Sequence, residues 1–293
     1  MRTFGSFAVI DWSGAKSQWH KGIAIAVCEV GQEAPALVQP ADAHWTRQAA
    51  LNWMVEQALE KRDLVIGIDL STSLPFDDRQ AYFPGWDASP STAKQLWQLV
   101  DEMSCKDDHL SVTSFLGHSE VSRHFRQHRN CGDLFQPGAG RMRVCEAMGQ
   151  ATIPGINPIS CFNLVGAAQV GKSSLTGMRV LHKLAQRIPV WPYDPLPAHG
   201  PVIVEIYTSI AARASGTLRK GKSKILDAAT LDQALRAFGS APHAKLHHYT
   251  DHATDAILTA AWLRIAAQQS ALWSPELLTP KIAATEGWTF GVS

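Results

Sequence analysis

The sequence is short of cysteine and of charge. Its 293 residues include only five cysteines, which are scattered and form no C-x-x-C pair. This spacing excludes a disulfide framework and a zinc-finger arrangement. Charged residues make up 18% of the chain, and 27 Lys and Arg against 26 Asp and Glu give a formal net charge of +1. That balance argues against a surface that is basic throughout, although it leaves room for a local basic patch.

Long hydrophobic runs are also missing. The most apolar helical stretch, residues 256–267, is interrupted by Arg264 and falls short of the roughly 20 residues that a bilayer span needs. Near the N-terminus, Asp11 follows a very short apolar run, so no secretory signal is predicted. We therefore expect a cytoplasmic protein with reduced thiols and no membrane partner.

What the chain does contain is a set of short apolar runs typical of strands. Residues 7–11, 22–30 and 36–39 predict a closely spaced antiparallel meander, and residues 46–61 have helical spacing. The runs at residues 63–69 and 201–207 predict buried parallel strands. The sequence thus predicts an α/β fold, in which a mixed sheet of antiparallel meander and parallel strands is flanked by helices.

Between these strands the composition changes. From about residue 76 to 200, Pro, Gly, Trp and His are frequent and the strand signal is weak. We predict a large, mainly helical insertion within a single domain spanning residues 1–293. A strong helix at 251–267 and a short strand at 288–292 are expected to close the chain. This order opens both the ribonuclease-H-like and the actin-like ATPase architectures, and order alone does not separate them.

Carboxylates stand at the ends of the predicted strands. Asp11 and Asp69 each end an apolar run, and Glu205 lies inside a third. Sites in open α/β sheets lie beyond the carboxyl ends of the strands, so adjacent parallel strands would bring such acids together. Asp251 and Asp255 are four residues apart and share one helix face. A shared site for Mg²⁺ or Mn²⁺, which prefers oxygen ligands, is the hypothesis that joins all five acids.

Each acid also has a simpler interpretation. A strand-end aspartate can cap a turn, and Asp251 and Asp255 suit the start of a helix next to Thr250. Glu205 is harder to explain this way, because a charge inside a Val-Ile-Val-x-Ile strand is costly unless it is paired. A structural ion-pair network is therefore the alternative to a shared metal site.

Several short motifs, in this order along the chain, resemble the domain-of-unknown-function-429 family. They are IDWSGA at 10–15, GIDLS at 67–71, SLTGM at 174–178, VWPY at 190–193, VEIY at 204–207, DHATDA at 251–256 and EGWTFGV at 286–292. The resemblance covers nearly the whole chain and implies a ribonuclease-H-like predicted nuclease. By that resemblance the catalytic and metal-site residues are Asp11, Asp69, Glu205 and Asp255.

A basic loop follows the Glu205 strand. Residues 213–224 contain five cations, no acid and two glycines, a composition that suits phosphate contacts. We predict that phosphates are bound by Arg219, Lys220, Lys222 and Lys224. The alternative is a solvated charged loop. The predicted partner is a nucleic acid or a smaller phosphodiester, and the sequence does not indicate an oligomeric state.

Residues 166–173 fit the phosphate-binding pattern G-x-x-x-x-G-K-[ST] in full. The pattern requires a strand before it and a helix after it, and the preceding stretch contains Pro158 and Asn163. We therefore interpret the match as accidental. An ATP-binding phosphotransferase or ATPase, either of this kind or actin-like, is the main rival function. A non-catalytic binding protein of the same fold is the third.

Histidines gather around the start of the last predicted helix. His248 and His252 have the four-residue spacing that a zinc site can use, but no H-E-x-x-H motif accompanies them. We interpret these histidines as surface and helix-cap residues, one of which is a candidate proton shuttle beside the acids.

Overall fold

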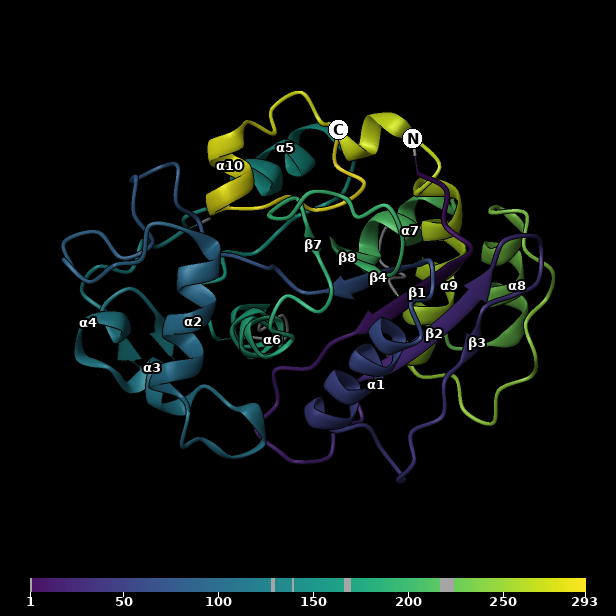
Figure 1. The fold of residues 1–293 in the computed structure, drawn as a ribbon, viewed down its shortest axis with the longest axis horizontal. Coiled ribbons are helices and arrows are strands. Elements are labelled where there is room, and N and C mark those ends of the chain that lie inside the picture. The colour runs from purple at the N-terminus through teal and green to yellow at the C-terminus, as the bar shows by residue number, and fades with distance from the viewer. Residues whose placement is uncertain (1, 128–129, 139, 166–169, 217–223) are drawn as a thin grey trace.

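A six-stranded mixed sheet forms the centre of the computed structural model (Figure 1), which describes residues 2–127, 130–138, 140–165, 170–216 and 224–293. The strand order is β3-β2-β1-β4-β8-β7. β1 pairs antiparallel with β2, and β2 with β3, whereas β1–β4, β4–β8 and β8–β7 are parallel. The strand bounds are β1 (Ser6–Asp11), β2 (Ala24–Glu29), β3 (Ala36–Leu37), β4 (Leu64–Asp69), β7 (Val190–Trp191) and β8 (Val202–Ile206). The predicted α/β fold with a mixed sheet is confirmed.

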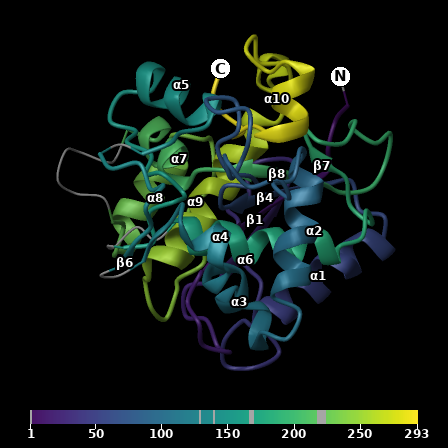
Figure 2. The same cartoon turned by 90° about the vertical axis from the view of Figure 1, so that its left-hand side faces the viewer.

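Helices cover both faces of the sheet. One face packs against α1 (Arg47–Leu59), α2 (Ala93–Met103) and α6 (Val170–Lys183). The other packs against α7 (Thr208–Ala214), α8 (Ala228–Arg236) and α9 (Asp251–Ala266). Figures 1 and 2 show α1 and α9 on opposite sides of β1. The strands are therefore hydrophobic on both faces, which is why they read as continuous apolar runs.

Alternation along each strand assigns every side chain to one of the two cores. In β1, Ala8 and Ile10 belong to the core under α1 and α6, whereas Phe7 and Val9 belong to the core under α9. Successive strand residues point to opposite faces, so Asp11 points to the same side as Val9. This alternation determines which of the acidic side chains lie on the same face of the sheet.

The segment predicted as an insertion is part of this layered core. Within residues 76–200, α2 and α6 complete one helix layer, and β7 adds the edge strand beside β8. Smaller elements fill the rest. They are η1 (Asp108–Leu110), α3 (Thr113–Gly117), α4 (Ser119–Ser122), the ribbon β5 (Arg126–Gln127) and β6 (Asn130–Cys131), and α5 (Val144–Thr152). The segment therefore buries apolar surface that the sheet would otherwise expose.

The C-terminal part differs from the prediction in one respect. The helix expected at 251–267 is observed as α9 and is followed by η2 (Ser270–Trp273) and α10 (Pro280–Thr285). The strand expected at 288–292 is wrong, because Thr289 forms only an isolated bridge to Glu205. Trp288 and Phe290 are instead buried in the core around α9. No helix among the described residues has the length and apolarity to span a bilayer.

Gly67 sets how closely α9 approaches β4. A Cβ at this position would lie 2.9 Å from Ile206 Cγ2 and 3.3 Å from Leu263 Cδ2. We expect Gly67→Val to lower the free energy of unfolding by about 1–3 kcal/mol, because the added methyl groups overpack this contact. Urea denaturation measures the change. Gly117→Ala is the control, since its Cβ would meet nothing within 4 Å, and equal stability losses in the two variants would contradict the close packing.

Candidate active site

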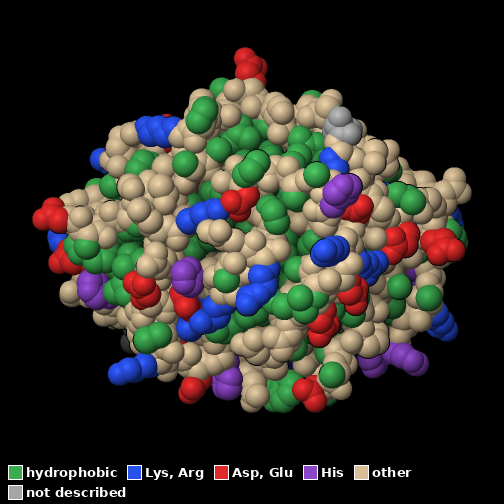
Figure 3. All heavy atoms as spheres, viewed as in Figure 1, with side chains coloured by type: hydrophobic (Ala, Val, Ile, Leu, Met, Phe, Trp, Pro, Cys, Tyr) green, Lys and Arg blue, Asp and Glu red, His purple; other side chains and the backbone are tan. Residues whose placement is uncertain are grey.

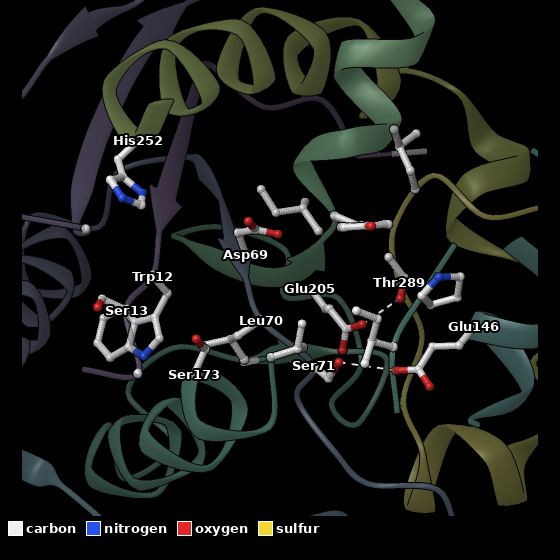
Figure 4. A pocket seen from close by; sticks show the side chains of 18 of the residues that line it. Trp12, Ser13, Asp69, Leu70, Ser71, Glu146, Ser173, Glu205, His252 and Thr289 are labelled. Carbon is white, nitrogen blue, oxygen red and sulfur yellow. Dashed lines mark hydrogen bonds between the residues drawn. The ribbon is translucent and has the colours of Figure 1, made fainter. Parts of the chain in front are cut away.

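Two of the predicted acids lie side by side at the carboxyl edge of the sheet. Asp11 ends β1 and Asp69 ends β4, and the two residues are partners in the parallel register. Both follow the parity of the core beneath α9, which includes Val9 and Val65. Asp11 is buried, and Asp69 lines a cavity (Figure 4).

Helix α9 brings a third acid to this edge. Its N-cap Thr250 accepts a hydrogen bond from the backbone N–H of Ala253, which fixes where the helix begins. His252 and Asp255 are three residues apart and share a face of α9. His252 Nδ1 lies 3.2 Å from Asp11 Oδ1. Asp255 makes no hydrogen bond or ion pair with any described residue, whereas His252 links α9 directly to Asp11.

The electrostatics show that these acids are close and poorly compensated. Burial raises the pKa of Asp11, and the hydrogen bond with His252 offsets part of this. Burial and then the charges of Asp11 and Asp255 raise the pKa of Asp69 well above its usual range. Its partner is Thr208, whose backbone N–H and hydroxyl donate at 3.3 and 3.2 Å. Burial and then the charges of Asp11 and Asp251 raise the pKa of Asp255 to about 7.

Asp251 lies beside this group but is already paired. It is the first residue of α9, and its carboxylate forms an ion pair with Lys224. Lys224 therefore lies next to the acids rather than free to meet a phosphate. The other predicted phosphate ligands, Arg219, Lys220 and Lys222, lie outside the described residues. Of the two acids that open α9, Asp255 is the one with uncompensated charge.

Glu205 is the predicted acid that the structure separates from the rest. In the β4–β8 register it is paired with Ile68, and Asp69 is paired with Ile206. Because side chains alternate, Glu205 points to the opposite face from Asp69. There Arg143 donates to it twice, from Nη2 to Oε1 at 2.5 Å and from Nη1 to Oε2 at 2.8 Å. The expectation that Glu205 joins the acid cluster as a metal ligand does not agree with this placement.

The partners of Glu205 satisfy its charge completely. Its carboxylate also accepts from the backbone N–H of Thr72 at 2.7 Å and from the hydroxyl of Thr289 at 2.5 Å. Although burial opposes ionisation, the charge of Arg143 holds the pKa of Glu205 below its usual value. Arg143 also binds Glu146, through Nε at 2.9 Å. For this residue the structural ion-pair network is the interpretation that the contacts support.

A cavity of about 830 Å³ opens between the two polar groups. Asp69 and His252 line one part of its wall, and Glu205 and Glu146 line another, as Figure 4 shows. Trp12 and Ser13 lie on the far side from Thr289. The volume is that of a pocket for a small molecule or a short chain segment, since such pockets span roughly 300–1,000 Å³. Of the acid cluster, Asp69 lines this cavity and is reachable from a site of ligand size.

Within the described residues, the segment that matches the phosphate-loop pattern lacks the preceding strand that this pattern requires. Gly171, Lys172 and Ser173 lie in the first turn of α6, so a helix does follow. Residues 166–169 lie outside the described residues. Residues 157–165, which precede them, contain no strand, only an isolated bridge between Asn163 and Arg126. The strand that the nucleotide-binding pattern requires is missing from this stretch.

Comparisons with known proteins give no further information on the site. The chain matches no protein-family model, no curated protein and no solved structure. The resemblance to the domain-of-unknown-function-429 family stays a prediction. Within the described residues, no three His, Cys, Asp or Glu side chains are already arranged to hold a metal ion.

Two partners of these acids, Thr208 and Arg143, were not singled out from the sequence as site residues and had no usable signal there. His252 was named only as one of several candidate proton shuttles, although it stands three residues before Asp255 on the same helix face. Thr208 reaches Asp69 because β4 and β8 are neighbours, and Arg143 is far from Glu205 in the chain.

The raised pKa of Asp255 predicts a gain in stability on neutralisation. A folded-state pKa of about 7 against the ordinary 3.8 means that stability falls as pH rises from about 4 to 7. We expect Asp255→Asn to raise the free energy of unfolding by about 2 kcal/mol or more at pH 8, and by less than about 1 kcal/mol at pH 4. Urea denaturation at both pH values measures this. The exposed Asp42→Asn should change neither, and a loss of stability at pH 8 in Asp255→Asn would refute the charge crowding.

For the Arg143 network we predict the opposite effect, namely that removing a charge lowers the stability of the protein. We expect Arg143→Met to cost about 3–5 kcal/mol of unfolding free energy, because it leaves Glu205 buried without its cation. Arg143→Met combined with Glu205→Gln should recover part of that loss. Arg123→Met is the matched control, since the Arg123–Asp133 pair is exposed and screened by solvent, so its loss should cost far less stability. Similar losses for Arg143 and Arg123 would contradict the interpretation.

Proposed function

We propose that the protein is a metal-dependent phosphodiester hydrolase with a ribonuclease-H-like architecture. The observation that carries the proposal is the register pairing of Asp11 with Asp69, with Asp255 facing them from α9. The antiparallel meander β1–β2–β3, followed by α1 and the parallel strand β4, is consistent with that architecture. The resemblance noted in the sequence supports the same reaction class.

The residues present fit a divalent cation in donor type and in charge. All three acids offer carboxylate oxygens, which Mg²⁺ and Mn²⁺ prefer. Burial and then the charges of neighbouring acids raise the pKa values of Asp69 and Asp255, so a bound cation would lower the cost of keeping them ionised. Asp11, Asp69 and Asp255 would hold the ion, with Asp251 available if Lys224 releases it. When bound, such an ion supplies charge neutralisation and a more acidic water for attack on phosphorus.

The chain's own side chains have separable roles around this site. Thr208 fixes the orientation of the Asp69 carboxylate through two hydrogen bonds. His252 orients Asp11, and its half-exposed ring is able to exchange protons with solvent. Lys224 balances Asp251 at the rim of the site. These contacts hold the acids before any substrate arrives.

The charge distribution favours a small or single-stranded phosphodiester over a long duplex. On the face shown in Figure 3, Lys and Arg are interspersed with Asp and Glu and form no continuous basic surface. The net charge of +1 points the same way. A cavity of about 830 Å³ admits a nucleotide-sized group rather than a double helix.

The rival functions make different demands on the site. A phosphate-loop ATPase needs a strand directly before its loop, and residues 157–165 form none. An actin-like ATPase would have the same order of first strands. It would differ from the proposed hydrolase by hydrolysing nucleoside triphosphates. A non-catalytic binding protein would keep the acids but cleave nothing.

Metal binding and cleavage test the proposal together. Mg²⁺ or Mn²⁺ at about 100 times its dissociation constant should stabilise the protein by about 2.7 kcal/mol, a rise in Tm of roughly 4 °C. With the metal present we expect cleavage of dinucleotides or single-stranded DNA or RNA, and Asp11→Asn should lower it by at least about 100-fold. Asp42→Asn is the control. Equal cleavage by wild type and Asp11→Asn, or ATP turnover without diester cleavage, would end the proposal.

A further inference from the structure

The cavity extends well beyond the acids. From Asp69 and His252 it continues along the loop at residues 12–22, which joins β1 to β2, and along residues 156–159. A scissile phosphate and its metal need only the end near Asp69. The remaining volume is available to the group that the phosphate carries.

Apolar side chains form this remote part. Trp19 and Ile159 are 43% and 40% exposed, and both line the cavity. Pro158 and Trp12 line it as well. A large aromatic side chain left half exposed beside a cavity offers a flat surface on which a planar ring can stack.

A buried histidine in the same wall lacks hydrogen-bond partners. His20 lines the cavity and is only 2% exposed, yet neither of its ring nitrogens has a partner among the described residues. Burial and then the charge of Arg47 lower the pKa of His20 to about 4. At neutral pH the ring is therefore uncharged, with one donor and one acceptor. Both ring nitrogens are buried, so His20 packs behind the cavity wall and supports Trp19 rather than offering hydrogen bonds to a ligand.

The loop that carries these residues is held in place. Arg47, itself buried, donates to the backbone carbonyls of Ser13 and Ala15 and, at 2.8 Å, to that of His109. The Trp12 indole N–H donates to the hydroxyl of Thr176 at 3.1 Å. The wall formed by Trp19 and His20 is thus anchored to α1 and α6 before any ligand binds.

We propose that this wall is a nucleobase subsite, in which a base stacks on Trp19 between the apolar side chains that line the cavity, with its phosphate held near Asp69. The inference rests on the proposed function and names its substrate class, a nucleotide-bearing phosphodiester. A nucleobase has the planar apolar face that such stacking requires. A sugar phosphate without a base lacks it.

Cleavage of matched substrates tests the subsite. The pair consists of a dinucleotide and the same molecule with an abasic sugar in place of one base, tested for each of the two positions. The wild type should prefer the dinucleotide by at least about tenfold in kcat/KM, and Trp19→Ala should reduce that ratio to near one. Leu277→Ala, an exposed apolar residue outside the cavity, should keep the ratio. Equal rates on the dinucleotide and both abasic analogues would overturn the subsite while upholding the hydrolase.

If neither substrate is cleaved, ligand binding without turnover tests the subsite. Titration calorimetry should show adenosine 5′-monophosphate binding the full-length protein at least about tenfold more tightly than ribose 5-phosphate. Trp19→Ala should remove that difference, whereas Leu277→Ala, outside the cavity, should keep it. Binding that responds in this way upholds the subsite even if the hydrolase proposal fails. Equal affinities for the two ligands, or no binding of either, would refute it.

Discussion

The buried guanidinium of Arg143 joins the segments that meet at the carboxyl edge of the sheet. It binds Glu205 on β8 and Glu146 on α5, and it donates to the backbone carbonyl of Glu286 at 3.0 Å. The Glu286 carboxylate in turn accepts from three backbone N–H groups, at Phe76, Asp77 and Val144. Four segments distant in the chain are thereby fixed to one another. The cavity wall beside Asp69 depends on this network, because Arg143, Glu146 and Glu205 all line it.

Two groups of acids with different environments therefore lie beside one cavity, which Asp69, Glu146 and Glu205 line. Glu205 and Glu146 share a buried cation and are satisfied. Asp69, Asp255 and Asp11 lie near one another; their neighbours are a hydroxyl, an amide and an imidazole, with the cation of Lys224 beside Asp251 and Asp255. The first group stabilises the fold and the second costs stability, as expected where charge is kept for binding or chemistry. The contrast supports the proposal that the acid cluster, rather than the Arg143 network, carries the function.

Much of the framework followed from local sequence. The runs ending at Asp11 and Asp69 became β1 and β4, and the periodic stretches at 46–61 and 251–267 became α1 and α9. The error at 288–292 has a physical reason, since Trp288 and Phe290 are buried by packing on α9 rather than by strand pairing. The 76–200 segment gave little strand signal, yet its α2 and α6 cover one face of the sheet, because long-range contacts and not local propensity place them there.

By itself, the sequence determined that acids would stand at strand ends and at the start of the last helix, because strand termination and helix capping are local properties. Only the tertiary structure decided which of them meet. A shift of one residue in the β4–β8 register sends Glu205 to the opposite face from Asp69, and with both faces buried no hydrophobic pattern reveals that parity. Local sequence likewise does not reveal that Arg143 pairs with Glu205, or that the ring nitrogens of His20 have no partner among the described residues. In both cases chain segments far away in sequence surround the side chain.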